Sequence, residues 1–152
     1  MITDRTASDV SLAKTLRAKL QSGQTLSDAE ISILERGALT INTLNRIEEK
    51  QAELKGLLNR AGYYNTPIVN KSWTYQGFFN ETEFKRLLNN LNVLRTAFFV
   101  FSDTPETPPI SFDYNDINSL EKILFDLETM LNDMKSRYRE CGTIYCGEEN
   151  EK

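Results

Sequence analysis

The sequence predicts an all-α fold: three heptad-bearing helices follow a short N-terminal helical pair, with extended aromatic connectors and a small C-terminal hairpin. Three segments repeat one spacing of apolar residues, and a residue able to cap a helix precedes each of them. Of the 152 residues, 39% are hydrophobic and 26% are charged, as in a soluble globular domain. We therefore expect one compact unit, with a helical pair at 1–37, a bundle at 38–140 and a hairpin or tail at 141–152.

The first expected helix spans residues 8–20 and carries an apolar stripe at a spacing of four residues. Ser8 or Asp9 can cap its start, and Ser22 and Gly23 end it. The spacing is typical of an amphipathic helix. The stripe consists of Leu12, Leu16 and Leu20, with Val10 and Ala13 beside it.

A second, shorter helix is expected to begin at a capping box. Ser27 and Glu30 have the Ser-x-x-Glu spacing, in which each side chain accepts a hydrogen bond from the backbone amide of the other residue. Gly37 follows the apolar residues of this segment closely, so we expect the helix to end there.

Three longer helices are expected to share one register. Their apolar positions step by three, four, three and four residues, which is the spacing of a heptad seam. Isolated helices shorter than about 12 to 15 residues are marginal in water, so the seams must pack within the chain or against symmetry mates in a ring or trimer. The seam residues are Leu44, Ile47, Leu54 and Leu58; Phe84, Leu87, Leu91, Leu94 and Phe98; and Leu120, Ile123, Leu127, Met130 and Met134.

Gln51 is the one polar residue on these seams. A single polar residue on a seam can fix the register and the number of partners, which favours packing between copies. Exposure at a frayed part of the seam explains the residue equally well.

The sequence also predicts where the three long helices begin and end. Thr40, Asn80 and Asp116 stand at equivalent positions before the three seams, and the short side chain of each can cap a helix. Gly62 is expected to end the first long helix and residues 102–105 the second, while the third should end near Tyr138.

Two connectors, residues 62–79 and 101–115, are extended, contain proline and are rich in aromatic residues. Long loops of this kind need packing to hold them, and aromatic rings bury a large area where they dock; a ligand pocket is the alternative. In the C-terminal hairpin, Cys141 and Cys146 are either reduced thiols or one local bridge. The aromatic candidates for packing or partner contact are Trp73, Tyr75, Phe78, Phe79, Phe112, Tyr114 and Tyr145, with Tyr63 and Tyr64.

No enzyme chemistry is visible in the sequence. It contains no histidine, the residue most used for proton transfer near neutral pH, and no phosphate-binding or serine-hydrolase motif. We therefore expect no enzyme, no cofactor and no metal. The carboxylates of the long helices lie outside the seams and are expected in solvent: Glu48, Glu49, Glu121, Asp126 and Glu128.

Charge and hydropathy disfavour nucleic acid and membrane partners. The net charge is −4, whereas binding to a phosphate backbone needs Lys and Arg concentrated on one face. No apolar run approaches the roughly 18 residues of a membrane span, and the start lacks the pattern of a signal peptide. We expect the protein to be made and to fold in a cytoplasm.

An ordered series of motifs resembles a region of tail and other virion structural proteins of tailed bacteriophages that infect Gram-positive bacteria. The resemblance implies a helical module that attaches to other virion proteins, within an assembly in which the chain is a homo-oligomer. In such proteins further domains often follow the last motif, whereas this chain stops at it, so we expect a connector rather than a receptor-binding role. The motifs are ITDRTASDV, LSDAE, TINTLNRIE, the Trp-containing connector with ETEFKRLLNNLNVLR, and DINSLEKILFDLETM with YRECGTIYCGE.

The functional expectation is therefore a non-enzymatic virion component of the tail or baseplate that acts through protein-protein contacts. Two alternatives come from other classes. One is a cytoplasmic helical adaptor or regulator that binds a host protein through an apolar groove. The other is a sugar-binding module centred on Trp73 and Tyr75, because an exposed aromatic ring offers an apolar face to a sugar.

Overall fold

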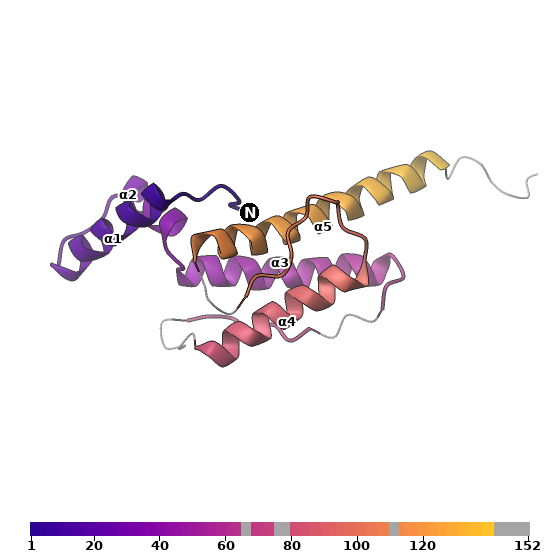
Figure 1. Ribbon diagram of the computed structural model, residues 1–152, viewed down its shortest axis with the longest axis horizontal. Helices are drawn as coiled ribbons and strands as arrows, with labels where there is room; N and C mark the ends of the chain where they lie inside the picture. The colour runs from indigo at the N-terminus through magenta and orange to yellow at the C-terminus, as the bar shows by residue number, and fades with distance from the viewer. Residues whose placement is uncertain (65–67, 75–79, 110–112, 142–152) are drawn as a thin grey trace, which may run out of the picture.

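The computed structural model describes residues 1–64, 68–74, 80–109 and 113–141. Within these residues the chain forms five helices and no strand, which confirms the all-α prediction. A pair of helices lies at one end of an elongated molecule, and three longer helices pack as a bundle beyond which the last turns of the final helix project (Figure 1). The helices are α1 (Ala7–Gln21), α2 (Asp28–Gly37), α3 (Ile41–Arg60), α4 (Glu81–Ala97) and α5 (Tyr114–Cys141).

Thr6 caps α1, so the prediction of Ser8 or Asp9 as the cap is wrong. The Thr6 hydroxyl accepts from the Asp9 backbone N at 3.3 Å, and the Asp9 carboxylate accepts from the Thr6 backbone N at 2.7 Å. Asp9 is thus the second partner of a capping box. The box predicted for α2 is confirmed, since the Ser27 hydroxyl accepts from the Glu30 backbone N at 3.3 Å.

The two helices of this pair approach closely at Gly37. A Cβ atom at this position would lie 2.0 Å from the Asp9 backbone oxygen and 2.8 Å from the Ala13 Cβ atom, so only glycine fits. At the other end of the pair, Lys19 Nζ donates to Glu30 Oε1 at 2.5 Å. Gly37, predicted only as a helix end, therefore also sets the distance between the helices.

The three long helices run in the same direction (Figure 1). Contacts between α3 and α5 follow this direction, because Arg46 Nη2 donates to Glu121 Oε1 at 2.7 Å and Lys50 Nζ donates to Glu128 Oε1 at 3.0 Å. A connector between parallel neighbours must return along the bundle. This requirement explains why the connectors are long and extended, and why residues at equivalent places in the repeat lie at similar levels.

Most of the predicted seam residues are buried in one apolar core. Three predicted seam residues are only half-buried: Phe98, Met130 and Met134. The heptad spacing places Met130 on the seam, but its neighbour Leu131 is the buried residue there. Leu88 and Leu124 are buried in addition, because α4 and α5 contact more than one neighbour and so bury a face wider than a narrow seam. The buried seam residues are Leu44, Ile47, Leu54, Leu58, Phe84, Leu87, Leu91, Leu94, Leu120, Ile123 and Leu127.

Gln51 is fully buried, so the alternative of an exposed, frayed position is wrong. Its Nε2 donates to the Leu87 backbone oxygen at 3.1 Å, and its Oε1 accepts from Asn90 Nδ2 at 3.2 Å. A buried amide is tolerated when its donors and acceptors are paired. Contacts within one chain therefore accommodate Gln51 without a symmetry mate.

The predicted caps Thr40 and Asn80 are confirmed, because their side chains accept from the backbone N atoms three residues later. Asp116 is not a cap. The Asp113 carboxylate accepts from the backbone N of Asn115 at 2.7 Å and of Asp116 at 3.1 Å, so the helix begins earlier than predicted. Asp116 accepts from the Asp113 backbone N at 2.9 Å in return.

The other helix ends differ by a few residues from the predictions. The first long helix stops at Arg60, close to Gly62, whose φ of +93° only glycine adopts readily. The second stops at Ala97, before residues 102–105, and the third continues to Cys141, beyond Tyr138. The predicted hairpin lies outside the described residues, and so does any bridge to Cys146.

Candidate functional site

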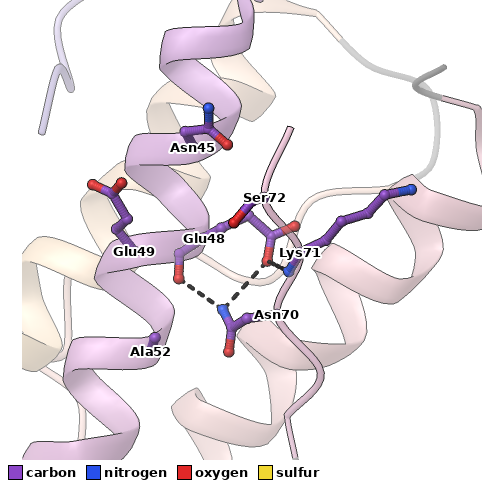
Figure 2. Close-up of a pocket in the computed structure, with 7 residues that line it drawn as sticks. All are labelled: Asn45, Glu48, Glu49, Ala52, Asn70, Lys71 and Ser72. Atoms are coloured by element: carbon purple, nitrogen blue, oxygen red, sulfur yellow. Dashed lines mark hydrogen bonds between the residues drawn. The ribbon is translucent and has the colours of Figure 1, made fainter. Parts of the chain in front are cut away.

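A shallow hollow of about 310 Å³ lies between α3 and the connector of residues 68–74 (Figure 2). Helix α3 lines it with residues at positions i, i+3, i+4 and i+7, which share one face of a helix. The connector closes the opposite side. The lining residues are Asn45, Glu48, Glu49 and Ala52 from α3, and Asn70, Lys71 and Ser72 from the connector.

Glu48 holds the connector to two helices, although its side chain is buried. Arg86 of α4 donates from Nη1 to Glu48 Oε2 at 3.2 Å and from Nη2 to Oε1. From the connector, Trp73 Nε1 donates to Oε1 at 3.2 Å and the Lys71 backbone N donates to Oε2 at 3.3 Å. Asn70 Nδ2 donates to the Glu48 backbone oxygen at 2.7 Å. The bond to Glu48 raises the pKa of the Arg86 guanidinium above its ordinary value.

Trp73 is held through its backbone as well as its ring. Asn45 Oδ1 accepts from the Trp73 backbone N at 2.7 Å, and Asn45 Nδ2 donates to the Trp73 backbone oxygen at 3.0 Å. The ring is 4% exposed and belongs to the core, and Lys71 Nζ lies 4.5 Å from its centroid. Trp73 therefore packs against the bundle, and it offers no open ring face on which a sugar could stack.

The buried carboxylate of the hollow, Glu48, is not placed for proton transfer. A general base needs a lone pair that can reach a substrate proton, but both Glu48 oxygens already accept from at least two donors. Glu49 is the exposed carboxylate at the rim. The side chains that face solvent here are short or charged.

A second buried carboxylate, Glu121 of α5, fixes the N-terminal segment to the bundle. Arg5 Nη2 donates to Glu121 Oε1 at 2.8 Å, Arg46 Nη2 donates to the same oxygen at 2.7 Å, and the Ile2 backbone N donates to Oε2. Arg5 also donates from Nε to the Arg36 backbone oxygen, at the end of α2, at 2.9 Å. One arginine thus links the helical pair to α5.

A third buried carboxylate, Asp126, binds the second connector. Its Oδ2 accepts from the Thr104 hydroxyl at 2.7 Å and from Lys122 Nζ at 2.9 Å. Lys122 Nζ also donates to Asp103 Oδ2, one residue before Thr104, at 3.3 Å. The hydrogen bond from Lys122 to Asp126 raises the pKa of this lysine above its ordinary value.

The prediction that the carboxylates outside the seams are solvated is wrong for three of them. Glu48, Glu121 and Asp126 are 3%, 0% and 3% exposed, whereas Glu49 is exposed and Glu128 half-buried. The physical reason is that connectors and the N-terminal segment cover the helix faces that the seams leave open. Each buried carboxylate is paired with at least one cation, as a buried charge requires.

The other predicted contact residues are only partly described. Tyr114 is half-buried at the start of α5, and Tyr63 packs edge-on against Phe98 with ring centroids 5.0 Å apart. Tyr64 is 78% exposed, so it does not pack as predicted. Five predicted residues lie outside the described part of the chain: Tyr75, Phe78, Phe79, Phe112 and Tyr145.

The sequence did not identify the partners of the buried polar groups. These partners are Arg5, Arg46 and Arg86 for the carboxylates and Asn90 for Gln51. Arg5 and Glu121 are 116 positions apart, and Arg86 and Glu48 are 38 apart. No local spacing identifies such partners. The one sign of a buried polar contact in the sequence was Gln51, the single polar residue on the seams, which accepts a hydrogen bond from Asn90.

The described residues offer neither a metal site nor a membrane helix. No group of three or more His, Cys, Asp or Glu side chains could hold a metal ion there. None of the described helices combines the length and apolar character needed to cross a membrane. Comparison of the chain with protein-family models, with curated protein sequences and with solved structures finds no match.

Proposed function

We propose that this chain is a non-enzymatic structural component of a tailed-phage particle, a connector in the tail or baseplate that acts through contacts with other virion proteins. The ordered motifs that resemble virion proteins support this proposal. The exposed apolar stripe of α1, Leu12 and Leu20, supports it independently, and it is the observation that carries the proposal.

Helices α1 and α2 pack on each other but leave several of their apolar side chains exposed. Ala13 is the one buried residue of α1, and α2 has none. Leu12, Leu20, Ile31 and Ile33 remain 49%, 44%, 43% and 38% exposed. Leu12 and Leu20 are eight residues apart and share one side of α1, so they form an exposed apolar stripe of the kind that a partner protein covers.

The fold fixes this surface at one end of the molecule. The bonds from Arg5 to Glu121 and to the Arg36 backbone oxygen join the N-terminal segment, α2 and α5. The pair therefore stands beyond the start of the bundle, away from the last turns of α5 (Figure 1). A chain with a separate contact surface at one end suits a connector, which must touch neighbours on different sides.

The proposal predicts that Leu12→Gln with Leu20→Gln removes the chain from particles without unfolding it. Both side chains are about half exposed, so an amide is tolerated in the free chain. The measurement is the amount of chain in particles purified from cells that express the variant in place of the original. Ala18→Gln, at an exposed position of the same helix, is the matched control and should enter particles normally.

Normal incorporation of the double variant would contradict the role of the helical pair. An adaptor that binds a host protein through the same exposed side chains is equally affected by the double variant, so this experiment alone does not separate the two proposals. The two proposals differ in location: an adaptor is abundant in the lysate and absent from particles even without substitution. No described feature favours the sugar-binding alternative, because the Trp73 ring is buried.

A further inference from the structure

Helix α2 presents an exposed apolar side chain between two carboxylates. Ile31 is 43% exposed. Asp28 stands three residues before it and Glu35 four residues after it, so the three side chains share one side of the helix. Neither carboxylate forms an ion pair with a described residue, although Glu35 accepts a hydrogen bond from Asn42 Nδ2. We refer to Asp28, Ile31 and Glu35 as the acidic face.

The other exposed isoleucine of α2 has a different setting. Ile33 is 38% exposed, but the acidic residue one turn before it, Glu30, is paired with Lys19 at 2.5 Å. The residue three positions after it is the basic Arg36. Only the side of α2 that carries Ile31 therefore combines an apolar side chain with two carboxylates that lack a cation among the described residues.

A cavity of the opposite charge lies between the last turns of α3 and the facing part of α5. It has a volume of about 530 Å³ and is open to solvent, and pockets of about 300 to 1,000 Å³ are large enough to hold a ligand-sized group. We refer to it as the basic cavity. Its apolar lining includes Leu57, Tyr63, Leu131 and Met134, and its charged lining is Arg60 and Lys135.

The two cations of the basic cavity have no carboxylate partner within the described part of the chain. Its described lining contains no Asp or Glu. Arg60 belongs to α3 and Lys135 to α5, so each of the two helices contributes one cation. An apolar cavity with two cations is the complement of an apolar side chain with two carboxylates.

We propose that the acidic face of one copy of the chain docks into the basic cavity of a second copy. Ile31 enters the apolar part of the cavity, and Asp28 and Glu35 pair with Arg60 and Lys135 in charge-assisted hydrogen bonds. The contact joins two different surfaces, so it repeats from copy to copy around a ring or along a filament.

The positions of the two surfaces allow this repetition. Helix α2 stands before the start of α3, whereas the cavity lies at the end of α3, at the other end of the bundle (Figure 1). One copy can therefore offer its acidic face to one neighbour and its cavity to another at the same time. The inference concerns contacts between copies of this chain, and it does not depend on the virion role.

The test is the mass of the purified full chain in solution, measured by light scattering up to about 1 mM, where weak contacts are populated. The mean mass should rise with concentration above the 17.5 kDa of one chain. It should fall when the salt concentration is raised from about 0.1 M to about 1 M, because the screening length shortens from about 10 Å to about 3 Å. A mass of one chain at every concentration would overturn the proposal and leave both surfaces to other proteins.

The two exposed isoleucines of α2 provide a matched pair of variants. Ile31→Gln should reduce the rise in mass, because an amide loses the apolar contact inside the cavity. Ile33→Gln makes the same change on another side of the helix and should leave the rise intact. Equal effects of the two variants would overturn the place of Ile31 in the contact.

Reversing the charges of one surface at a time tests the pairing itself. Asp28→Lys with Glu35→Lys should give a monomer, and so should Arg60→Glu with Lys135→Glu, each with an unchanged helix signal in circular dichroism. A mixture of the two double variants should associate again, because each surface of one variant then meets the opposite charge on the other. A mixture that stays monomeric, or a double variant that associates as the original chain does, would overturn the proposal.

Discussion

Replacing Glu48 by glutamine removes one negative charge from the centre of the contacts that hold residues 68–74 and changes the shape of the side chain little. The amide oxygen can still accept from Trp73 Nε1, but the carboxylate partner of Arg86 is lost. Breaking a buried ion pair typically costs about 3 to 5 kcal/mol. Arg86 is 20% exposed and keeps a second partner, because its Nε donates to Glu83 at 2.9 Å. We therefore expect Glu48→Gln to lower the free energy of unfolding by about 2 to 3 kcal/mol.

The assay is equilibrium unfolding in urea, followed by circular dichroism at the helix band. Glu49→Gln is the matched control: it removes the same charge one position further along, where the side chain is exposed, and should change the free energy of unfolding by less than about 0.5 kcal/mol. Equal effects of the two variants would refute the reasoning, because they would show that Glu48 contributes no more than a solvated surface charge.

Three further predictions test other parts of the fold. Leu91 is fully buried, so Leu91→Ala should lower the free energy of unfolding by about 2 to 5 kcal/mol, and an unchanged melting temperature would contradict its place in the core. Gly37→Ala should disrupt the α1–α2 contact, and hydrogen exchange should show this as a loss of amide protection in both helices. Gly56→Ala is the control: its Cβ would meet nothing closer than 3.6 Å, so it should stabilise α3 by about 0.5 to 1 kcal/mol. Hydrogen bonding from Lys19 lowers the pKa of Glu30 to about 2. The ionised Glu30 side chain therefore contributes its full stabilisation above the ordinary pKa of 4.5, and this stabilisation is lost as the pH falls through about 2. A carboxyl titration of Glu30 by NMR with its midpoint at the ordinary value would contradict this.

Local features of the fold could be predicted from the sequence because their causes lie within a few residues. Thr40, Asn80 and the Ser27–Glu30 box were identified from the side-chain types that bond to nearby amides. The cap of α1 was missed because several residues with short oxygen-bearing side chains, Thr6 among them, stand together there. Leu131 was missed because α5 contacts two helices and buries a broader face than the seam predicts.

The polar contacts and the helix direction could not be predicted because their causes lie far apart in the sequence. A carboxylate outside a seam is ordinarily solvated, and only the fold brings Arg86 to Glu48 or Arg5 to Glu121. The apolar spacing likewise carries no direction, so it could not distinguish parallel from antiparallel packing. The long aromatic connectors were an indirect sign of parallel packing, because parallel helices need long return segments between them.

The most direct test of the virion role is quantitative mass spectrometry of density-purified particles from the source lysate, counting this chain against the major capsid protein. The proposal predicts a fixed ratio that corresponds to a multiple of about three or six copies per particle, as symmetric tail and baseplate rings require. A chain that is abundant in the lysate and absent from the particles would contradict the virion role and favour the adaptor.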